Sequence, residues 1–278
     1  NMNSLLRYTF ELLMLIIFFI NSSFAAITNL NSPLDTTTQN DTPTGIYFSN
    51  DGSKVFVLGS RGDGGDKDSI AQYSLSTAYD VSTASDSIET LIVGAGGLGI
   101  SADPFGFTFN GDGSKVYVAD GNDDRIYEIT LGSNFDLTSS ATHTGTLNTD
   151  VANGSDIPCG ITFNNDGSKL FLAGFNDQEI VYWSLGTDYD IDTEGSANFF
   201  DLTPYKSASN FKPRDVDFNS NGTRMYVVDF NDDRIVVFKL DNAFDLSSGV
   251  TELGSIDTSS IDPQTFSSEF NSDGSKFY

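Results

Sequence analysis

The sequence predicts an all-β chain folded as a β-propeller, and three observations lead to this prediction. First, near-copies of one segment recur at residues 48–59, 109–129, 163–183, 218–238 and 270–278. Second, the copies are spaced by 61, 54, 55 and 52 residues when they are aligned on one turn glycine: Gly52, Gly113, Gly167, Gly222 and Gly274. Third, each copy shows short alternating strand patterns and no helix pattern. Four-stranded repeats of this length are typical of propeller blades.

Each full copy contains four predicted strands in the same order. The first strand follows a proline, at residues 43–48, 104–109, 158–163 and 213–218. An Asn-x-Asp-Gly or similar turn leads to the second strand, because glycine supplies the left-handed residue that a three-residue hairpin loop needs. In the second copy, the second strand is predicted at residues 115–119 and the third at 125–131.

An aromatic–Asp pair follows the third strand of every full copy: Tyr79-Asp80, Phe135-Asp136, Tyr189-Asp190 and Phe244-Asp245. We expect the aromatic ring to fill the space between neighbouring units and the Asp to cap a turn. A fourth strand is predicted after the pair, at residues 89–93, 142–147, 197–202 and 251–256.

The N-terminal residues 1–25 resemble a secretory signal peptide. Arg7 precedes an apolar run at residues 12–20, and Ser23 and Ala25 occupy the −3 and −1 positions of a cleavage site. The run is shorter than the roughly 20 residues that span a bilayer. The sequence therefore predicts a secreted, periplasmic or cell-surface protein with no transmembrane span beyond the signal peptide.

The remaining chain, residues 26–278, is predicted to form one propeller domain. Its repeats lie near residues 41–93, 103–147, 156–202, 211–256 and, in part, 262–278. The last copy stops in its second strand, and an unclosed ring would leave sheet edges exposed. We therefore expect the chain to be truncated in its fifth repeat, and residues 26–31 to form an outer strand that helps to close the ring.

The composition excludes some partners. Lys and Arg number 14 against 39 Asp and Glu, which gives a net charge of −25. Such a negative field argues against binding to nucleic acid or to anionic membranes. It is compatible with cations or with an extracellular protein or glycan.

The repeat resembles a known class at the pattern Pro-x-Gly-Ile-x-Phe-x-x-Asp-Gly-x-Lys-x-Tyr-Val. This pattern is similar to the YVTN-type, lactonase-like β-propeller repeat, and the resemblance covers roughly residues 41–278. The shared residues build blades, so the resemblance implies a fold more strongly than a function. It also implies that a lactone-hydrolysing member would use carboxylates, amides or His near the central opening, in some cases with a metal.

Loops between the second and third strands are predicted to gather at one face as an acidic loop face. They comprise residues 59–68, 120–124, 174–179 and 229–233. Two of them alternate oxygen ligands in a way that suits Ca²⁺, the one cofactor that the sequence suggests: Asp120, Asn122 and Asp124, and Asp229, Asn231 and Asp233. The alternative is that Asn-Asp tracts simply form turns, and these loops lack the distal Glu of better-defined calcium loops.

The first strands lie nearest the axis and offer a second candidate site. Asp217 stands where sister copies have Thr or Tyr, Asp215 stands where they have Gly, and Arg214 is an irregular cation beside them. We therefore assign these three residues as candidate ligand contacts, against the alternative of a solvated channel lining. No nucleophile–base pair, phosphate loop or cofactor fingerprint is visible.

These features favour a secreted binding module that contacts a protein, glycan or surface through the acidic loop face and the central opening. The first alternative is a lactonase-like hydrolase acting in the channel. A phosphosugar lactonase would need basic residues for its substrate, and the few cations of this chain count against the hydrolase alternative. The second alternative is a structural surface or virion adhesin component.

Overall fold

The computed structural model describes residue 34 and residues 42–60, 68–94, 97–100, 103–150, 157–207, 209–260, 264–271 and 276–278. The propeller belongs to a compact unit, Pro33–Tyr278. The predicted signal peptide, the predicted strand at residues 26–31 and most of the first acidic loop lie outside the described residues. Among the described residues, no helix is both long enough and apolar enough to cross a membrane.

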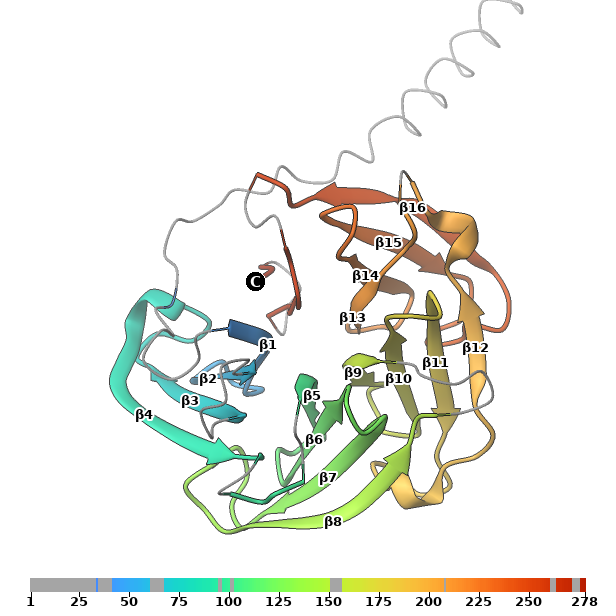
Figure 1. The fold of residues 1–278 in the computed structure, drawn as a ribbon. Coiled ribbons are helices and arrows are strands. Elements are labelled where there is room, and N and C mark those ends of the chain that lie inside the picture. The colour runs from blue at the N-terminus through green and yellow to red at the C-terminus, as the bar shows by residue number, and fades with distance from the viewer. Residues whose placement is uncertain are drawn as a thin grey trace, which may run out of the picture. The chain divides into compact units, whose positions relative to one another are not determined.

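Four antiparallel sheets of four strands form the blades of a β-propeller (Figure 1). Blade 1 contains β1 (Thr42–Phe48), β2 (Lys54–Ser60), β3 (Ser69–Leu75) and β4 (Ala84–Ile92). Blade 2 contains β5 (Pro104–Phe109), β6 (Lys115–Asp120), β7 (Arg125–Leu131) and β8 (Ala141–Asn148). Blade 3 contains β9 (Pro158–Phe163), β10 (Lys169–Gly174), β11 (Glu179–Ser184) and β12 (Asn198–Asp201). Blade 4 contains β13 (Pro213–Phe218), β14 (Arg224–Asp229), β15 (Arg234–Leu240) and β16 (Val250–Asp257).

The predicted fold class and strand order are confirmed. Strands pair in chain order within each blade, with the first strand innermost and the fourth outermost (Figure 1). Most predicted bounds agree within a residue or two. The largest difference is in β4, which begins five residues before its predicted start. Short 3-10 turns, η1 (Val81–Thr83) and η2 (Ile191–Thr193), precede the fourth strands of blades 1 and 3.

The hydrophobic core lies mainly between neighbouring blades. Buried side chains of blades 3 and 4, including Phe171 and Phe238, form one cluster. Those of blades 1 and 2, including Phe56 and Phe109, form another. Outer strands expose most of their residues, as in β16. A further cluster lies on one face of blade 1, includes Phe48 and Tyr73, and is packed against by Tyr278 of the fifth repeat. Blades therefore bury their faces largely against neighbouring repeats.

The turn glycine and the aromatic residue of each repeat form one packed unit. Gly113 has φ +74°, and a Cβ placed there would lie 2.3 Å from Cδ2 of Phe135. Phe135 also contacts Phe56 of blade 1, with ring centroids 6.3 Å apart, as expected for a residue between units. The neighbouring Asp136 caps a turn as predicted, since its Oδ1 accepts a 3.0 Å hydrogen bond from the Thr138 N–H. Asp80 caps η1 in the same way.

A lysine that opens the second strand joins four of the five repeats to a neighbouring repeat, and the repeat of blade 4 has Arg224 at this position. Its Nζ donates to the backbone carbonyl of the next repeat's aromatic residue, and we call this contact the blade latch. The pairs are Lys54 to Phe135, Lys115 to Tyr189, Lys169 to Phe244 and Lys276 to Tyr79. The last pair connects the fifth repeat to blade 1.

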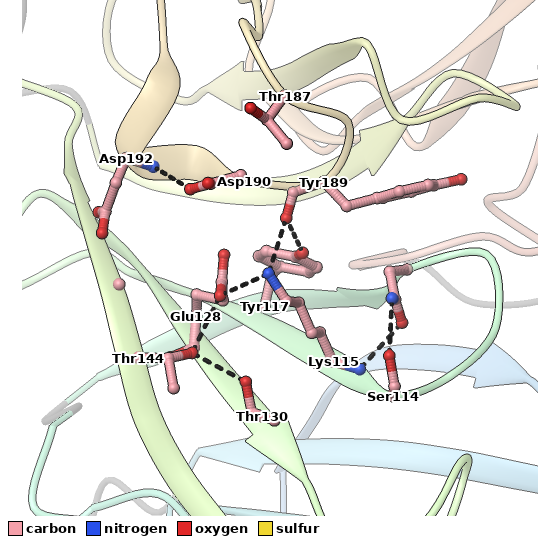
Figure 2. Close-up of polar contacts among 12 residues, drawn as sticks. Ser114, Lys115, Tyr117, Glu128, Thr130, Thr144, Thr187, Tyr189, Asp190 and Asp192 are labelled. Atoms are coloured by element: carbon pink, nitrogen blue, oxygen red, sulfur yellow. Dashed lines mark hydrogen bonds and ion pairs between the residues drawn. The ribbon is translucent and has the colours of Figure 1, made fainter.

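The latch between blades 2 and 3 carries extra polar contacts (Figure 2). The Tyr117 hydroxyl donates to the Tyr189 carbonyl, which also accepts from Lys115. Lys115 Nζ lies 2.8 Å from Oε1 of Glu128, a carboxylate whose side chain is only 6% exposed. Thr144 donates a further hydrogen bond to the same oxygen. The Oε2 atom of Glu128 is buried without a hydrogen-bond partner, so Lys115 is its main source of compensation.

The described part of the fifth repeat forms a small hairpin, with Phe270 bridged to Phe277. On one side it contacts blade 4, where the Phe270 and Tyr226 rings lie 4.5 Å apart. On the other side Tyr278 contacts blade 1, with its ring 4.5 Å from that of Phe48 and its hydroxyl bonded to the Tyr79 carbonyl. The hairpin thus links blade 4 to blade 1.

We predict that Gly113→Ala lowers the free energy of unfolding by about 2 to 4 kcal/mol. Left-handed backbone strain contributes about 1 kcal/mol, and the collision with Phe135 contributes the rest. Urea denaturation measures the loss. Gly99→Ala is the matched control, because Gly99 has φ +65° with no atom within 4 Å of an added Cβ. Equal losses in the two variants would contradict the packing argument.

We predict that Lys115→Met destabilises the protein by about 2 to 3 kcal/mol. The substitution leaves the Glu128 carboxylate without its cation. The loss of stability should be smaller than the usual 3–5 kcal/mol for a broken buried pair, because Lys115 is 27% exposed. The double variant Lys115→Met/Glu128→Gln should regain most of this loss. A double-mutant cycle by urea denaturation checks it, and additive losses would show that the pair is not coupled.

Candidate functional site in the central cavity

A cavity of about 390 Å³ lies among the first strands of the blades. Its lining comes from β1, β5, β9 and β13, from turn residues, and from residues 267–269 of the fifth repeat. Asn50, Gly111 and Asn165 belong to the lining and are solvent-exposed, so the cavity reaches the surface at the face that carries the Asn-x-Asp-Gly turns. Its volume falls in the range of small-molecule sites.

One repeat position supplies polar side chains to this cavity from every repeat. It is the residue before the last phenylalanine of the first strand: Tyr47, Thr108, Thr162, Asp217 and Glu269. Two neighbouring repeats therefore place carboxyl groups at equivalent positions of the ring. Asp217 is among the site residues predicted from the sequence, whereas Glu269 is not. The missed signal was its register, because Glu269 precedes Phe270 as Asp217 precedes Phe218.

These two carboxyl groups hold their protons unusually strongly. Burial raises the pKa of Asp217 to about 7, against the opposing effect of a 2.7 Å hydrogen bond that its Oδ1 accepts from the Phe218 N–H. Burial also raises the pKa of Glu269 well above its usual range, and the charge of Asp217 adds to the effect. The pair can therefore hold at least one proton near neutral pH.

Tyr47 occupies the equivalent position in blade 1, before the last phenylalanine of the first strand. Burial raises the pKa of its hydroxyl, and the carboxyls of Glu269 and Asp217 are the next causes. Its ring packs against Phe109, with centroids 5.1 Å apart. Tyr47 is therefore a neutral hydrogen-bonding group beside the two acids.

Asp215 anchors the fifth repeat. Its Oδ2 accepts hydrogen bonds from the Ser267 hydroxyl at 2.8 Å and the Ser268 N–H at 2.9 Å, and its Oδ1 accepts from the Val216 N–H at 2.9 Å. Burial is the main cause that raises the pKa of Asp215, to about 6. A Cβ on Gly160 of β9 would lie 1.9 Å from this carboxylate. A glycine is therefore needed at the point where β9 lies against Asp215.

Arg214 lies at a bulge of β13 and borders the same cavity. The pairing of β13 with β14 shifts between Pro213 and Asp215, which leaves Arg214 as the extra residue. Bulges redirect a side chain out of the sheet pattern. Its guanidinium is surrounded by four phenylalanine rings at centroid distances of 4.2–5.0 Å: Phe105, Phe175, Phe230 and Phe266. Arg214 Nη1 also donates a weak hydrogen bond to Sγ of Cys159 at 3.6 Å.

The structure thus brings Arg214, Asp215 and Asp217 to one cavity, with Glu269 and Tyr47 added. None of the acidic loop residues at 120–124, 174–179 or 229–233 contributes to the lining. Those loops return to the starts of the first strands, as the Phe230 N–H to Lys212 carbonyl hydrogen bond shows. The acidic loop face therefore lies at the opposite end of the first strands from the turn residues that line the cavity.

The loop residues proposed for Ca²⁺ hold their own turns. Asp120 is fully buried, and its Oδ1 accepts from the N–H groups of Asn122 and Asp123, both at 2.8 Å. Asp124 has φ +52°.

In blade 4, Asp229 pairs with Arg234 at 3.0 Å, and Asn231 donates to the Asn210 carbonyl at 2.9 Å. Asp233 has φ +46°. Within the described parts of the chain, no three His, Cys, Asp or Glu residues are grouped so that they could hold a metal ion. Calcium binding stays a prediction.

Comparisons with known proteins give structural neighbours only. No protein-family profile and no curated protein matches the sequence. A protein from Lactobacillus plantarum is 19% identical, with a TM-score of 0.49, and the match covers 81% of this chain and 57% of that one. A protein from Bacteroides fragilis, provisionally named a 6-phosphogluconolactonase, is 15% identical, with a TM-score of 0.46, covering 77% and 55%.

The periplasmic gluconolactonase PpgL of Pseudomonas aeruginosa is 19% identical, with a TM-score of 0.43, covering 76% and 53%. The chain thus spans little more than half the length of these three proteins. The β-propeller class rests on the blades themselves, and membership in the YVTN-type class stays a prediction.

We predict that stability falls as pH rises from about 4 to about 7. Asp215, Asp217 and Glu269 have raised pKa values, so the folded state binds more protons than the unfolded state in this window. Below the window all three groups are protonated in both states, and the destabilisation is absent. Urea midpoints measured from pH 4 to pH 8 check this slope.

The double variant Asp217→Asn/Glu269→Gln should flatten the slope. Asp166→Asn is the control, because hydrogen bonds from Ser168 lower the pKa of this exposed turn carboxyl and so place its effect below the window. An unchanged slope in the double variant would refute the assignment.

Proposed function

We propose that this protein hydrolyses a lactone of a sugar acid in its central cavity, with Asp217 and Glu269 as the acid–base pair. The observation that supports this most is the placement of two carboxyls, with raised pKa values, at equivalent positions on one cavity wall. Groups that titrate near the working pH transfer protons most effectively. Exposed carboxylates would already be ionised at that pH.

The two carboxyl groups and a water molecule supply the proton transfers of the reaction. The ionised member of the pair takes a proton from a water molecule as its oxygen attacks the ester carbonyl. The protonated member then gives its proton to the ring oxygen as the carbon–oxygen bond breaks. The product is the open hydroxy acid, and the pair returns to its starting state after one proton is exchanged with solvent.

The lining favours a hydroxyl-rich substrate. Thr108, Thr162, Asn50 and Tyr47 offer hydroxyl and amide groups, while Phe107 and Ile161 supply apolar surface. Arg214 is the one cation of the lining among the described residues. A doubly charged phosphate would meet three carboxyl groups and a single guanidinium, which supports a sugar-acid lactone without phosphate.

We predict that the purified chain hydrolyses D-glucono-1,5-lactone above the spontaneous rate, measured by acid release in a weakly buffered pH-indicator assay. Asp217→Asn and Glu269→Gln should each lower kcat by roughly 100-fold or more, the usual range for a lost acid or base. Asp166→Asn is the matched control and should retain activity. Equal rates in all four proteins would refute the proposal.

Binding without turnover is the competing outcome of the same experiment. It would appear as a ligand-dependent rise in melting temperature with no acid release. The cavity would then serve a binding module, as the sequence analysis favoured. Secretion and the identity of an extracellular partner stay predictions in either case.

A further inference from the structure

Arg214 has no counter-ion among the residues that the structure describes. Within the described residues it forms no ion pair, and its one hydrogen bond goes to Sγ of Cys159. Its Nε is buried with no acceptor. The residue as a whole is half-buried. Charged groups that lose water are ordinarily paired, because burial removes the water that would compensate them. An unpaired guanidinium is therefore unusual in a chain with a net charge of −25.

The phenylalanine cage holds this guanidinium without using its donors. Ring faces attract the charge, but the five N–H groups of an arginine need oxygen acceptors in its plane. The rings lie at the acidic-loop end of the first strands, where Phe175 and Phe230 follow β10 and β14. Of the four rings, only that of Phe105 belongs to the cavity lining. The cage therefore closes one end of the cavity and fixes Arg214 there.

Lys212 provides an internal comparison. Its Nζ lies 4.5 Å from the centre of the Phe175 ring, a ring that Arg214 also contacts at 4.2 Å. It donates to Oδ1 of Asn176 and is absent from the cavity lining. Two cations thus flank one ring, but only Arg214 borders the cavity.

We infer that Arg214 is the binding site for a carboxylate of the ligand, so that the natural ligand is a small sugar acid with a single negative charge. This assignment rests on the proposed function, which places the lactone end of the ligand at Asp217 and Glu269. Arg214 and Asp217 are three positions apart in β13, which corresponds to roughly 10 Å along a strand. The arginine side chain extends into the cavity and shortens the distance that the ligand must cover. A ligand of about six carbons with a terminal carboxylate is therefore long enough to reach from Arg214 to Asp217.

A carboxylate fits this site better than a phosphate. A planar guanidinium pairs with one carboxylate through two parallel hydrogen bonds. Asp215, Asp217 and Glu269 line the same cavity and would repel a dianion. The substrate class is therefore a lactone that keeps a free carboxylate, as the monolactone of a sugar diacid (an aldaric acid) does.

Three hexose probes test the assignment by calorimetric titration of the full chain: D-glucuronate, D-glucose and D-glucose 6-phosphate. We expect glucuronate to bind roughly 10- to 100-fold more tightly than glucose, the range of a charge-assisted contact. Glucose 6-phosphate should bind no better than glucose. Equal binding of glucuronate and glucose, or a preference for the phosphate, would overturn the inference.

Two variants locate the effect. Arg214→Gln should abolish the preference for glucuronate over glucose, while Lys212→Gln should keep it. If Arg214→Gln does not fold, Arg214→Lys keeps a charge in the cage but not the planar guanidinium, and should lose most of the preference for glucuronate over glucose. A preference lost in Lys212→Gln and kept in the Arg214 variant would refute the assignment.

The titrations are repeated in Asp217→Asn/Glu269→Gln, which separates the two proposals. If the double variant still prefers glucuronate to glucose and the wild-type protein shows no turnover, the carboxylate site stands and the hydrolase proposal fails. Turnover of gluconolactone together with equal binding of glucuronate and glucose leaves the hydrolase and removes the carboxylate site.

Discussion

The structure depends on packing between blades, because no blade can bury both of its faces alone. Most repeats therefore carry the parts that join them to the next repeat. The aromatic ring packs against the turn glycine. The backbone carbonyl of the aromatic residue accepts a hydrogen bond from the lysine of the preceding repeat. The fifth repeat uses the same lysine contact toward blade 1. The same local unit thus joins blade 1 to blade 2, blade 2 to blade 3 and blade 3 to blade 4.

Departures from the repeat concentrate on one side of that cavity. Blades 1 to 3 place glycine where blade 4 has Asp215, and this carboxylate fastens the fifth repeat through Ser267 and Ser268. The same strand carries Arg214 and Asp217. The glycines permit close approach of neighbouring first strands. In blade 4, Arg214, Asp215 and Asp217 instead place charged side chains between this blade and the fifth repeat.

Electrostatics inside the cavity differ from those of the surface. Outside, Asp residues cap turns and their pKa values are lowered by hydrogen bonds, as at Asp112 and Asp166. Inside, burial dominates and raises the pKa of each carboxyl. The same residue type is therefore an ionised turn former on one part of a repeat and a carboxyl with a raised pKa on another, and the difference is set by access to water.

The sequence by itself determined the repeats, the number and order of strands, the turn caps and the innermost position of the first strands. These features are local, because glycine, proline and Asn-Asp patterns select turns and alternating residues select strands. It also indicated Arg214, Asp215 and Asp217 as departures near the axis.

Only the tertiary structure decided which side chains meet. Glu269 joins Asp217 because ring assembly places two repeats side by side, and the cage of Arg214 draws rings from three blades and the fifth repeat. Asp120 and Asp229, which looked like free ligands in the sequence, turn inward to backbone N–H groups and Arg234. Contacts between residues that lie some 50 positions apart are set by packing, and the sequence pattern of one repeat does not encode them.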